Sequence, residues 1–356
     1  MFEGLSIRSH KGSYQILFDD RVLDKLGQLL DGQPHFLIDA NVARLYADQL
    51  HPILGHPHTL VIEATEENKS IERIIPVIAR LVANQVRRDH ILIAIGGGII
   101  QDITCFIAST LLRGMTWKFV PTTLLAQSDS CIGSKSSINL GQSKNILGTF
   151  NPPHEIFVCA EFLDTLEDKD IRSGIGEMLK VHAIDSAAAY DRLAADYDAL
   201  RTDKRLLLAY IRQALLIKQR FIEIDEFDRG VRNIFNYGHS FGHAIESATD
   251  FGVPHGVAVT IGMDMANRIA VLRGLLPERH YLRMNSVLRK NYRPFAATPI
   301  PTDTMMSALK KDKKNTTEKL VLILPVGDDA KIQRVEIAPD AAFRGQCQLF
   351  LDGMDA

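Results

Sequence analysis

Three consecutive glycines, Gly96 to Gly98, separate an apolar run typical of a buried strand from an apolar run typical of a helix. The first run is HILIAI and the second is IIQDITCFIASTLL. A strand, a glycine turn and a helix in this order let a phosphate group approach backbone N–H groups at the start of the helix. The GxGxxG fingerprint is absent, so the context favours a nucleotide or phosphate site over a tight turn alone without identifying the ligand.

Strand-like and helix-like segments alternate through the first half of the chain. HFLIDANV, HTLVIEA, HILIAIGGG and WKFVPTT are apolar runs that end in polar or glycine-rich turns. Between them, residues 70–86 carry isoleucines at helical spacing, and Pro76 predicts a kink or a late start of that helix. The alternation predicts a parallel sheet with helices on both faces. Asp39, at the end of HFLI, suits a hydrogen bond to a ribose hydroxyl.

The second half of the chain is mainly helical. Helical periodicity dominates from about Asp168 to about Leu276, and KLVLILPVG followed by KIQRVEIA predicts a strand pair. We therefore predict an α/β protein with two domains, residues 1–167 and residues 168–356. In the helix predicted over residues 205–222, Lys218 shares the apolar stripe, so its buried charge needs a partner.

Composition and charge exclude several classes of protein. The chain has 356 residues with 41 Lys and Arg against 43 Asp and Glu, whereas nucleic-acid binders normally carry a clear basic excess. No uncharged apolar run reaches the length of about 18 residues that a membrane span requires. The four cysteines form no CxxC pair, which is typical of a reduced protein. We expect a cytoplasmic protein with neither nucleic-acid nor membrane partners.

Histidines in NYGHSFGHAIE suggest a metal site. His239 and His243 are spaced i and i+4, so both imidazoles lie on one helix face, and Gly238 and Gly242 permit close packing beside them. His255 follows in VPHGVAV, and Glu177 in GIGEMLK can complete a mixed nitrogen and oxygen set of the kind that zinc accepts. Hydrogen-bonded core histidines remain the alternative, because the HExxH glutamate is absent.

Several basic residues lie near Gly, Asn or His, which suggests an anion site, although each alone is more typical of a solvated surface charge. Lys180 is an exception, because it follows Glu177 by three residues and shares its helix face. Lys218 is another, because of its apolar stripe. The full set is Lys135, Lys144, Lys180, Lys218, Arg232 and Lys313.

These segments, in order over nearly the whole chain, resemble the dehydroquinate synthase and wider sugar phosphate cyclase family. The matching stretches are DANVA, EENKS, GGGIIQD, Arg113-Gly114, PTTLLAQSDSCIGSK, KNILGTFNPP, GIGEMLK, DEFDRGVRNIFNYGHSFGHAIE, HGVAVTIGM and DKKN. The resemblance implies a Rossmann-like, parallel-sheet NAD domain joined to a mainly α-helical metal-binding domain. It also implies a homodimer that acts on a small sugar phosphate with NAD and Zn2+, or Co2+, as cofactors.

The resemblance also implies roles for individual residues. Those implied to contact NAD are Asp39, Asn41, Glu66, Lys69, Gly97, Gly98, Asp102, Thr122, Thr123, Asp129 and Lys144. The implied metal ligands are Glu177, His239 and His255, whereas His243 matches a phosphate-contacting residue. Lys135, Asn145 and Lys313 or Lys314 match the rest of the phosphate pocket, and Arg113 is implied to reach it from the other subunit. Lys218 and Arg232 match residues near a substrate carboxylate, and Asp129, Lys144, Lys180 and Asn236 match its hydroxyl side.

By resemblance, the reaction converts 3-deoxy-D-arabino-heptulosonate 7-phosphate to 3-dehydroquinate and phosphate. NAD+ is transiently reduced, phosphate is eliminated, the hydride returns and an aldol step closes the ring. Three departures from the family pattern, Ser134, Val257 and Asp228, leave the substrate open. The alternatives are an amino-dehydroquinate, valiolone or deoxyinosose type of cyclase and, more distantly, a metal-dependent polyol dehydrogenase or a homologue without activity. Arg232 with Asn236 favours a carboxylated substrate.

Overall fold

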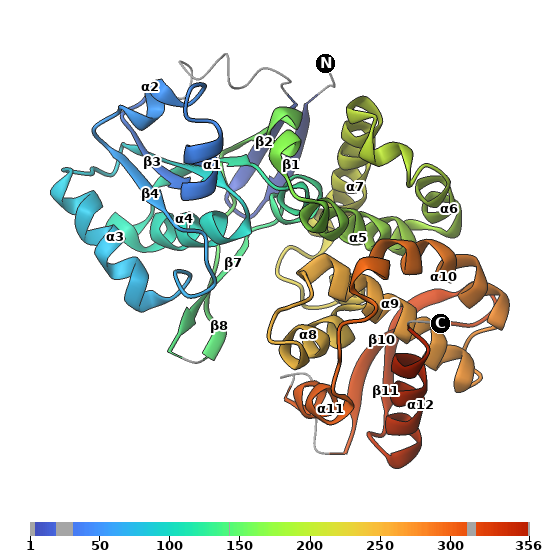
Figure 1. Cartoon of the computed structure of the whole chain (residues 1–356). Helices are drawn as coiled ribbons and strands as arrows, with labels where there is room; N and C mark the ends of the chain where they lie inside the picture. Colours follow the sequence, from blue (N-terminus) through green and yellow to red (C-terminus); the bar gives the residue numbers. More distant parts are fainter. Residues whose placement is uncertain (1–3, 19–30, 142, 312–317, 355–356) are drawn as a thin grey trace. The chain divides into compact units, whose positions relative to one another are not determined.

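The computed structural model describes residues 4–18, 31–141, 143–311 and 318–354 (Figure 1). Contacts along the chain divide it into two compact units. The first comprises Met1–Leu166 and Ile211–Arg229, and the second comprises Glu167–Tyr210 and Gly230–Ala356. The predicted domains, residues 1–167 and 168–356, remain a prediction, and the contacts add that residues 211–229 belong with the first unit.

Within the described residues, the first unit is built on a seven-stranded sheet with the order β1-β2-β9-β6-β5-β3-β4. Neighbouring strands are parallel except for β1 and β2, so the predicted parallel sheet is confirmed with one antiparallel edge strand. The strands are β1 (Leu5–Ser9), β2 (Gly12–Phe18), β3 (Pro34–Asp39), β4 (Thr59–Ile62), β5 (Ile91–Gly96), β6 (Thr116–Pro121) and β9 (Glu155–Val158).

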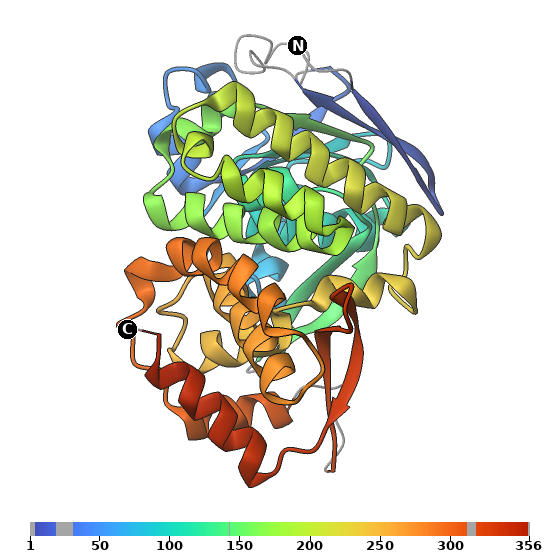
Figure 2. The same ribbon diagram turned by 90° about the vertical axis from the view of Figure 1, so that its right-hand side faces the viewer.

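Helices of the first unit connect these strands. They are α1 (Ala40–Leu45), α2 (His51–Leu54), α3 (Ile71–Ala83), α4 (Gly98–Thr110) and short segments at Leu111–Arg113, Ala126–Ser130 and Ala160–Thr165. α3 begins at Ile71 and contains Pro76, so a start of the helix after the proline is wrong. α7 (Lys204–Ile224), the long helix seen in Figure 2, begins in the second unit and ends in the first.

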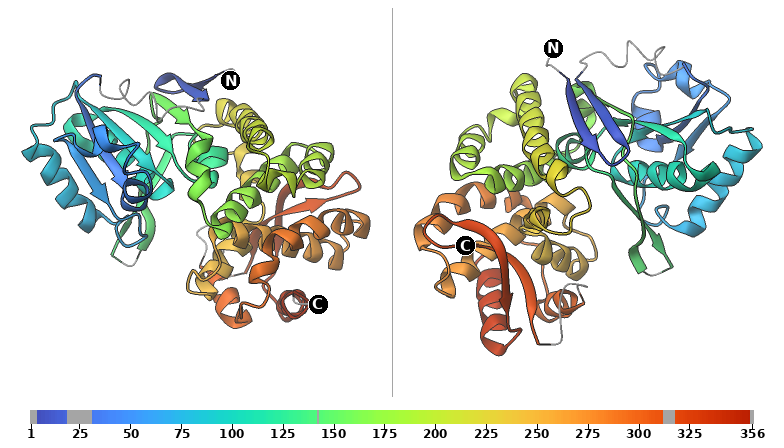
Figure 3. Two further views of the ribbon diagram at one scale, coloured as in Figure 1. Left: turned by 45° about the horizontal axis from the view of Figure 1, so that its top comes forward. Right: turned by 180° about the vertical axis from the view of Figure 1, so that it is seen from behind.

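A separate hairpin of the first unit carries several candidate site residues. β7 (Lys135–Leu140) pairs antiparallel with β8 (Ser143–Phe150), and Figure 3 shows the hairpin extending away from the seven-stranded sheet. β8 is largely exposed. The sequence patterns do not predict this hairpin, because a strand without a buried face has no regular alternation of apolar and polar residues.

The second unit is mainly helical, as predicted. Its helices are α5 (Asp168–Asp185), α6 (Ala187–Ala195), α8 (His239–Ala248), α9 (His255–Leu272), α10 (Glu278–Tyr292), α11 (Thr302–Lys310) and α12 (Ala341–Asp352), with short segments at Ala199–Arg201, Val231–Asn236 and Arg293–Phe295. α9 is buried along most of its length and forms the centre of the unit. The predicted strand pair is confirmed as the antiparallel β10 (Leu320–Val326) and β11 (Lys331–Ile337). None of the described helices is both long and apolar enough to cross a membrane.

Candidate functional site

Glycines let three helices of the second unit approach with their backbones almost in contact. A β-carbon on Gly256 would lie 1.9 Å from the carbonyl oxygen of Ser173, and one on Gly176 would lie 2.2 Å from the carbonyl oxygen of Gly256. α5 and the start of α9 therefore meet where larger residues cannot fit. This contact brings Glu177 on α5 next to His255, the first residue of α9.

A second glycine contact brings α8 against α9. Gly238 has a φ of +78°, and a β-carbon there would lie 2.6 Å from the carbonyl oxygen of Val259. On the α9 side, a β-carbon on Gly262 would lie 2.1 Å from the carbonyl oxygen of Gly238. The close packing predicted at Gly238 and Gly242 is therefore confirmed, and it fixes His239 at the start of α8.

The three predicted metal ligands lie together. Oε1 of Glu177 lies 3.6 Å from Nε2 of His239 and 3.5 Å from Nε2 of His255. Glu177 is buried, and its Oε1 accepts no hydrogen bond within the described part of the chain, while Oε2 accepts one from Lys180. A buried carboxylate oxygen without a donor, facing two imidazole nitrogens, fits a bound cation.

Charges around this carboxylate favour its ionised form. Burial acts to raise the pKa of Glu177, but Lys180, His239 and His255 outweigh it and hold that pKa well below the usual range. Burial and the Lys180 charge hold the pKa of His239 well below its ordinary value, so its imidazole is neutral. An anionic carboxylate and a neutral imidazole are the forms that bind zinc. Burial acts to lower the pKa of His255, but Glu177 and Glu246 outweigh it and raise that pKa to about 10, so a metal ion at this site must displace a proton from His255.

His243 lies in the same cluster. One ligand atom from each of His239, His243 and His255 can be chosen so that all three lie within 4.8 Å of one another. The geometry therefore keeps His243 within reach of a metal ion, whereas the family resemblance implies that it contacts phosphate. The choice of Glu177, His239 and His255 as ligands remains a prediction.

The glycine turn of the first unit has the predicted context. β5 ends at Gly96, Gly97 precedes α4 and Gly98 is the first residue of that helix. A β-carbon on Gly96 would lie 2.6 Å from a side-chain carbon of Ile100, and one on Gly97 would lie 3.0 Å from Thr123. The turn is therefore packed tightly against both α4 and the segment that follows β6.

The order in which the chain adds strands to the sheet reverses at this turn. From β3 the chain continues to β4 on one side and then to β5 on the other, so the reversal lies between β3 and β5. Asp39 ends β3, Gly96 ends β5 and Thr122 follows β6, which puts all three at the carboxyl edge of the sheet. Open α/β sheets bind ligands at this edge, beside the reversal. Asp39 also caps α1, because its Oδ1 accepts a hydrogen bond of 2.8 Å from Asn41 N–H.

Three other residues implied to contact NAD form one ion-pair cluster. Nζ of Lys69 lies 3.5 Å from Oε1 of Glu66 and 3.4 Å from Oδ2 of Asp102. The Lys69 ammonium also donates to Oδ1 of Asn145 at 2.9 Å, which ties the β7–β8 hairpin to this cluster. Burial raises the pKa of Asp102 to about 6, although Lys69 opposes the shift. The structure thus joins a residue implied to contact phosphate to those implied to contact NAD.

Two of the candidate lysines of the first unit have carboxylate partners there. Lys135 pairs with Asp228, and Nζ of Lys218 lies 2.9 Å from Oδ1 of Asp129. The partner that the buried position of Lys218 requires is thus confirmed. Lys144 lies on the exposed strand β8.

In the second unit, Lys180 and Arg232 are buried, and Asn236 donates to the carbonyl oxygen of Asn233 at 3.0 Å. Lys313 and Lys314 lie outside the described residues.

Arg113 lies in an unusual stretch of backbone. Leu112 and Arg113 have φ values of 52° and 64°, and Gly114 follows with 114°. Two successive residues other than glycine in the left-handed region carry backbone strain. Leu112 is also 40% exposed.

Glu246 is a site residue that the sequence reasoning does not single out. Both of its carboxylate oxygens lie 3.2 Å from Nδ1 of His255. Its spacing in the sequence could have indicated it. His239, His243 and Glu246 are at i, i+4 and i+7, so they share one face of α8.

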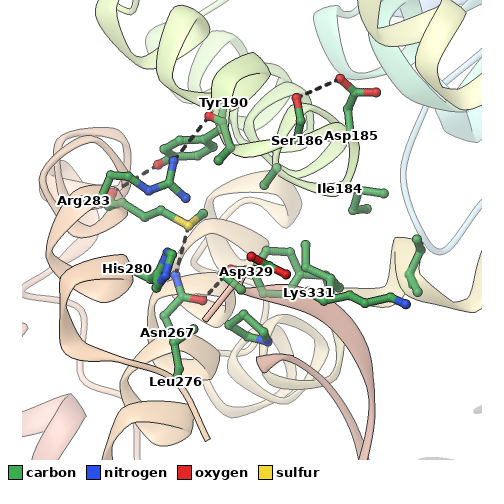
Figure 4. Close-up of a pocket in the computed structure, with 18 residues that line it drawn as sticks. Ile184, Asp185, Ser186, Tyr190, Asn267, Leu276, His280, Arg283, Asp329 and Lys331 are labelled. Atoms are coloured by element: carbon green, nitrogen blue, oxygen red, sulfur yellow. Dashed lines mark hydrogen bonds between the residues drawn. The ribbon is translucent and has the colours of Figure 1, made fainter. Parts of the chain in front are cut away.

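A cavity elsewhere in the second unit is lined by residues of α5, α6, α9, α10 and the β10–β11 turn. Its volume is about 320 Å³, and Figure 4 shows Tyr190, Asn267, His280 and Arg283 around it. The candidate site residues are not among those that line it.

Two family models match the chain. The model described as 3-dehydroquinate synthase N-terminal matches residues 59–173, and the model described as 3-dehydroquinate synthase C-terminal matches residues 174–315. A curated 3-dehydroquinate synthase from Streptococcus pyogenes serotype M3 (strain ATCC BAA-595 / MGAS315) is 33% identical over 335 residues, covering 91% of this chain and 93% of the relative.

Solved structures of related cyclases have the same fold. The 2-epi-5-epi-valiolone synthase from Streptomyces hygroscopicus subsp. jinggangensis 5008, solved with NAD+ and Zn2+ bound, is 28% identical. Its TM-score is 0.83, with 95% of this chain and 96% of that chain covered. A 2-deoxy-scyllo-inosose synthase complexed with carbaglucose-6-phosphate, NAD+ and Co2+ is similar in fold, at 22% identity and a TM-score of 0.81 over 99% of this chain and 100% of that chain.

Proposed function

The chain belongs to the 3-dehydroquinate synthase family, and on that basis we propose that it is an NAD- and metal-dependent sugar phosphate cyclase of the lyase class. Its reaction converts 3-deoxy-D-arabino-heptulosonate 7-phosphate to 3-dehydroquinate and phosphate, a step of the shikimate pathway. The observation that carries the proposal concerns Oε1 of Glu177. This oxygen is buried, accepts no hydrogen bond from the described residues and lies close to Nε2 of His239 and of His255. These residues hold a Zn2+ ion, for which Co2+ can substitute.

NAD is assigned to the carboxyl edge of the sheet, within residues 1–167. The reversal beside Gly96 and the N-terminus of α4 support this assignment, because backbone N–H groups there suit a pyrophosphate. Metal binding is assigned to residues 168–356. When bound, the metal ion acidifies and polarises a substrate hydroxyl while NAD+ accepts and later returns a hydride.

The basic residues offset the charges of the substrate. Arg232, a buried guanidinium, is assigned to the substrate carboxylate. Lys218 is assigned to the same carboxylate on the family resemblance. Lys135, Asn145 and His243 bind the phosphate, together with Lys313 or Lys314. Asp129, Lys144, Lys180 and Asn236 bind the hydroxyl groups. Because Lys135 is already paired with Asp228, a phosphate oxygen must replace or share that carboxylate when substrate binds.

The protein is proposed to act as a homodimer in which Arg113 reaches the phosphate pocket of the other subunit. The strained and exposed backbone at Leu112 and Arg113 supports this role, since strain at exposed positions is typical of functional contacts.

The proposed location of the protein is the cytoplasm, with no nucleic-acid or membrane partner. Burial raises the pKa of the Cys105, Cys131 and Cys347 thiols to about 12, so these thiols stay protonated and unreactive.

A second candidate is another sugar phosphate cyclase. Asp228, which pairs with Lys135, is one methylene shorter than the glutamate implied by the family pattern, and this difference alters the surroundings of the proposed phosphate lysine. The similarity to a valiolone synthase at 28% identity gives this alternative a specific substrate class. Comparing kcat/KM for the heptulosonate phosphate and for competing sugar phosphates at equal concentration separates the two candidates.

Phosphate release tests the proposed reaction directly. Purified protein loaded with Zn2+ and NAD+ is expected to release one phosphate for each 3-dehydroquinate formed, without net accumulation of NADH. The matched control is His255→Ala, which should release no phosphate while it still binds NAD+. Absence of phosphate release from the loaded wild-type protein would contradict the proposal. Steady accumulation of NADH with a simple polyol would indicate a dehydrogenase instead.

A further inference from the structure

The two histidines that face Glu177 are held by different partners at their other ring nitrogen. Nδ1 of His239 lies 3.4 Å from the carbonyl oxygen of Tyr237, which is a long and weak hydrogen bond. Nδ1 of His255 lies 3.2 Å from both carboxylate oxygens of Glu246. The outer contact of His255 is therefore to a charged group, and that of His239 is to a neutral one.

The surroundings of His255 make the contact with Glu246 important for holding the orientation of the His255 ring. The His255 side chain is 35% exposed, whereas the Glu246 side chain is 12% exposed. His255 is the first residue of α9 and follows Pro254, so its backbone is fixed while one side of its ring faces open space. Glu246 is well placed to hold the ring, because it lies inside α8, which the glycine contact presses against α9.

The contact also selects one tautomer of the imidazole. A carboxylate accepts hydrogen bonds and cannot donate them, so when a metal ion takes the place of the Nε2 proton, Glu246 keeps the remaining proton on Nδ1 and leaves the Nε2 lone pair to the metal ion. That lone pair lies on the side of Glu177 Oε1, 3.5 Å away. A negative partner on Nδ1 also makes Nε2 more basic and therefore a better metal ligand.

We propose that Glu246 is a positioning residue for metal binding, acting through His255. The inference rests on the proposed metal site and adds a residue to it. Val257, two residues after His255, is fully buried and apolar, so it offers His255 no polar partner. Loss of the Glu246 carboxylate is expected to weaken metal binding by a factor of about 10 to 100.

Metal affinity of the full-length protein tests the inference without relying on turnover. The dissociation constant for Zn2+ is measured by competition with a chromophoric chelator for the wild type, Glu246→Leu, Glu246→Gln and His255→Ala. Glu246→Leu is expected to bind Zn2+ about 10 to 100 times more weakly. Glu246→Gln should fall between it and the wild type, because a glutamine oxygen still accepts the Nδ1 proton without a negative charge. Glu278→Gln, which removes an exposed carboxylate of α10, is the matched control and should bind like the wild type.

The spectrum of the Co2+-loaded protein gives a readout that general destabilisation does not produce. Glu246→Gln is expected to shift the ligand-field bands, since the basicity of one ligand nitrogen changes while the ligand set stays the same. Equal Zn2+ affinity of the wild type and both Glu246 variants, together with weak binding by His255→Ala, would overturn the inference and leave the proposed function standing. Equal affinity of the wild type and His255→Ala would instead contradict the proposed metal site.

Discussion

Nζ of Lys218 lies 2.9 Å from Oδ1 of Asp129, although 89 residues separate the two in the sequence. Both side chains are largely buried, with 8% and 14% exposed. Asp129→Ala leaves a buried ammonium group without its carboxylate, so the free energy of unfolding should fall by about 3 kcal/mol or more. Urea denaturation of the metal-free protein measures the loss.

Replacing both partners provides the control for this ion pair. In the double variant Asp129→Ala, Lys218→Met neither charge of the pair remains, so most of the lost stability should return. A double variant as unstable as Asp129→Ala would show that the ion pair does not account for the loss.

Periodicity along the chain predicts that Lys218 is buried, but it cannot identify Asp129. A helix register determines which side chains face the core, because that pattern is local. The partner depends on which distant segments meet, and those contacts appear only in the folded chain. The same limit applies to Glu246, whose spacing on α8 matches the histidines but whose contact with His255 depends on the packing of α8 against α9.

Apolar runs made four strands of the seven-stranded sheet predictable. The runs that became β3, β5 and β6 are apolar because this part of the parallel sheet is covered, whereas β4, at the edge of the sheet, is only partly buried. β8, in contrast, is largely exposed and carries Gly148, so its sequence has no strand signal although it presents Lys144 and Asn145. The position of the sheet reversal between β3 and β5 also lies beyond local patterns, since it depends on strand order.

The glycine turn predicts a difference between two neighbouring substitutions. A β-carbon on Gly98 would have Ser130 Oγ as its nearest neighbour at 3.9 Å, so Gly98→Ala should fold normally. The added methyl group enters the space where a pyrophosphate approaches the start of α4, and NAD+ affinity should fall about tenfold or more. Fluorescence titration with NADH measures the change, and an unaltered dissociation constant would argue against NAD at this turn.

Gly96→Ala serves as the contrasting variant at the same turn. Its β-carbon would lie 2.6 Å from Ile100 Cγ1, so this change should destabilise the protein itself by about 1–3 kcal/mol. A lower thermal midpoint for Gly96→Ala, but not for Gly98→Ala, would separate the packing role of one glycine from the ligand role of the other.

The close approach of α9 to α5 predicts that Gly256→Ala disrupts the metal site. A β-carbon there would lie 1.9 Å from Ser173 O, so α9 must shift and carry His255 away from Glu177. Zn2+ affinity should fall more than a hundredfold, as measured by chelator competition. Gly345→Ala on α12 is the control, because beyond the neighbouring residues and backbone of its own helix nothing lies within 4 Å of its β-carbon, and alanine should stabilise that helix by up to about 1 kcal/mol. Unchanged Zn2+ binding by Gly256→Ala would mean that the helix contact does not set the ligand geometry.

Buried histidines of the first unit predict a loss of stability in acid. His35 is fully buried, its Nε2 lies 3.0 Å from Nδ1 of His90, and its ring stacks on His58 at 4.4 Å. Burial, followed by the neighbouring His58, His90 and His56, lowers its pKa from 6.5 to about 4. Between pH 6.5 and pH 4 the unfolded chain therefore binds a proton that the folded chain does not, and stability falls by about 3 kcal/mol as the pH drops.

His35→Gln tests this contribution, because glutamine does not titrate. The stability of the variant relative to the wild type should improve by about 3 kcal/mol between pH 7 and pH 4, as measured by urea denaturation at each pH. Well below pH 4 the difference should level off, since both states of the wild type then carry the proton. Parallel stability curves for the two proteins over the whole range would refute the assignment.

Strain at Arg113 predicts that stability and activity can be separated. Leu112 and Arg113 have φ values of 52° and 64°, which glycine adopts without strain, so Leu112→Gly and Arg113→Gly should leave the thermal midpoint unchanged or raise it slightly. The two variants relieve the same backbone strain, but Arg113→Gly also removes the guanidinium that is proposed to bind phosphate in the other subunit. Only Arg113→Gly should raise KM sharply.

Mixing the Arg113→Gly variant with a Lys135→Met variant should recover part of the activity, because a mixed dimer then contains one site in which both Arg113 and Lys135 are intact. No recovery on mixing, with dimers confirmed to exchange subunits, would mean that Arg113 acts within its own chain.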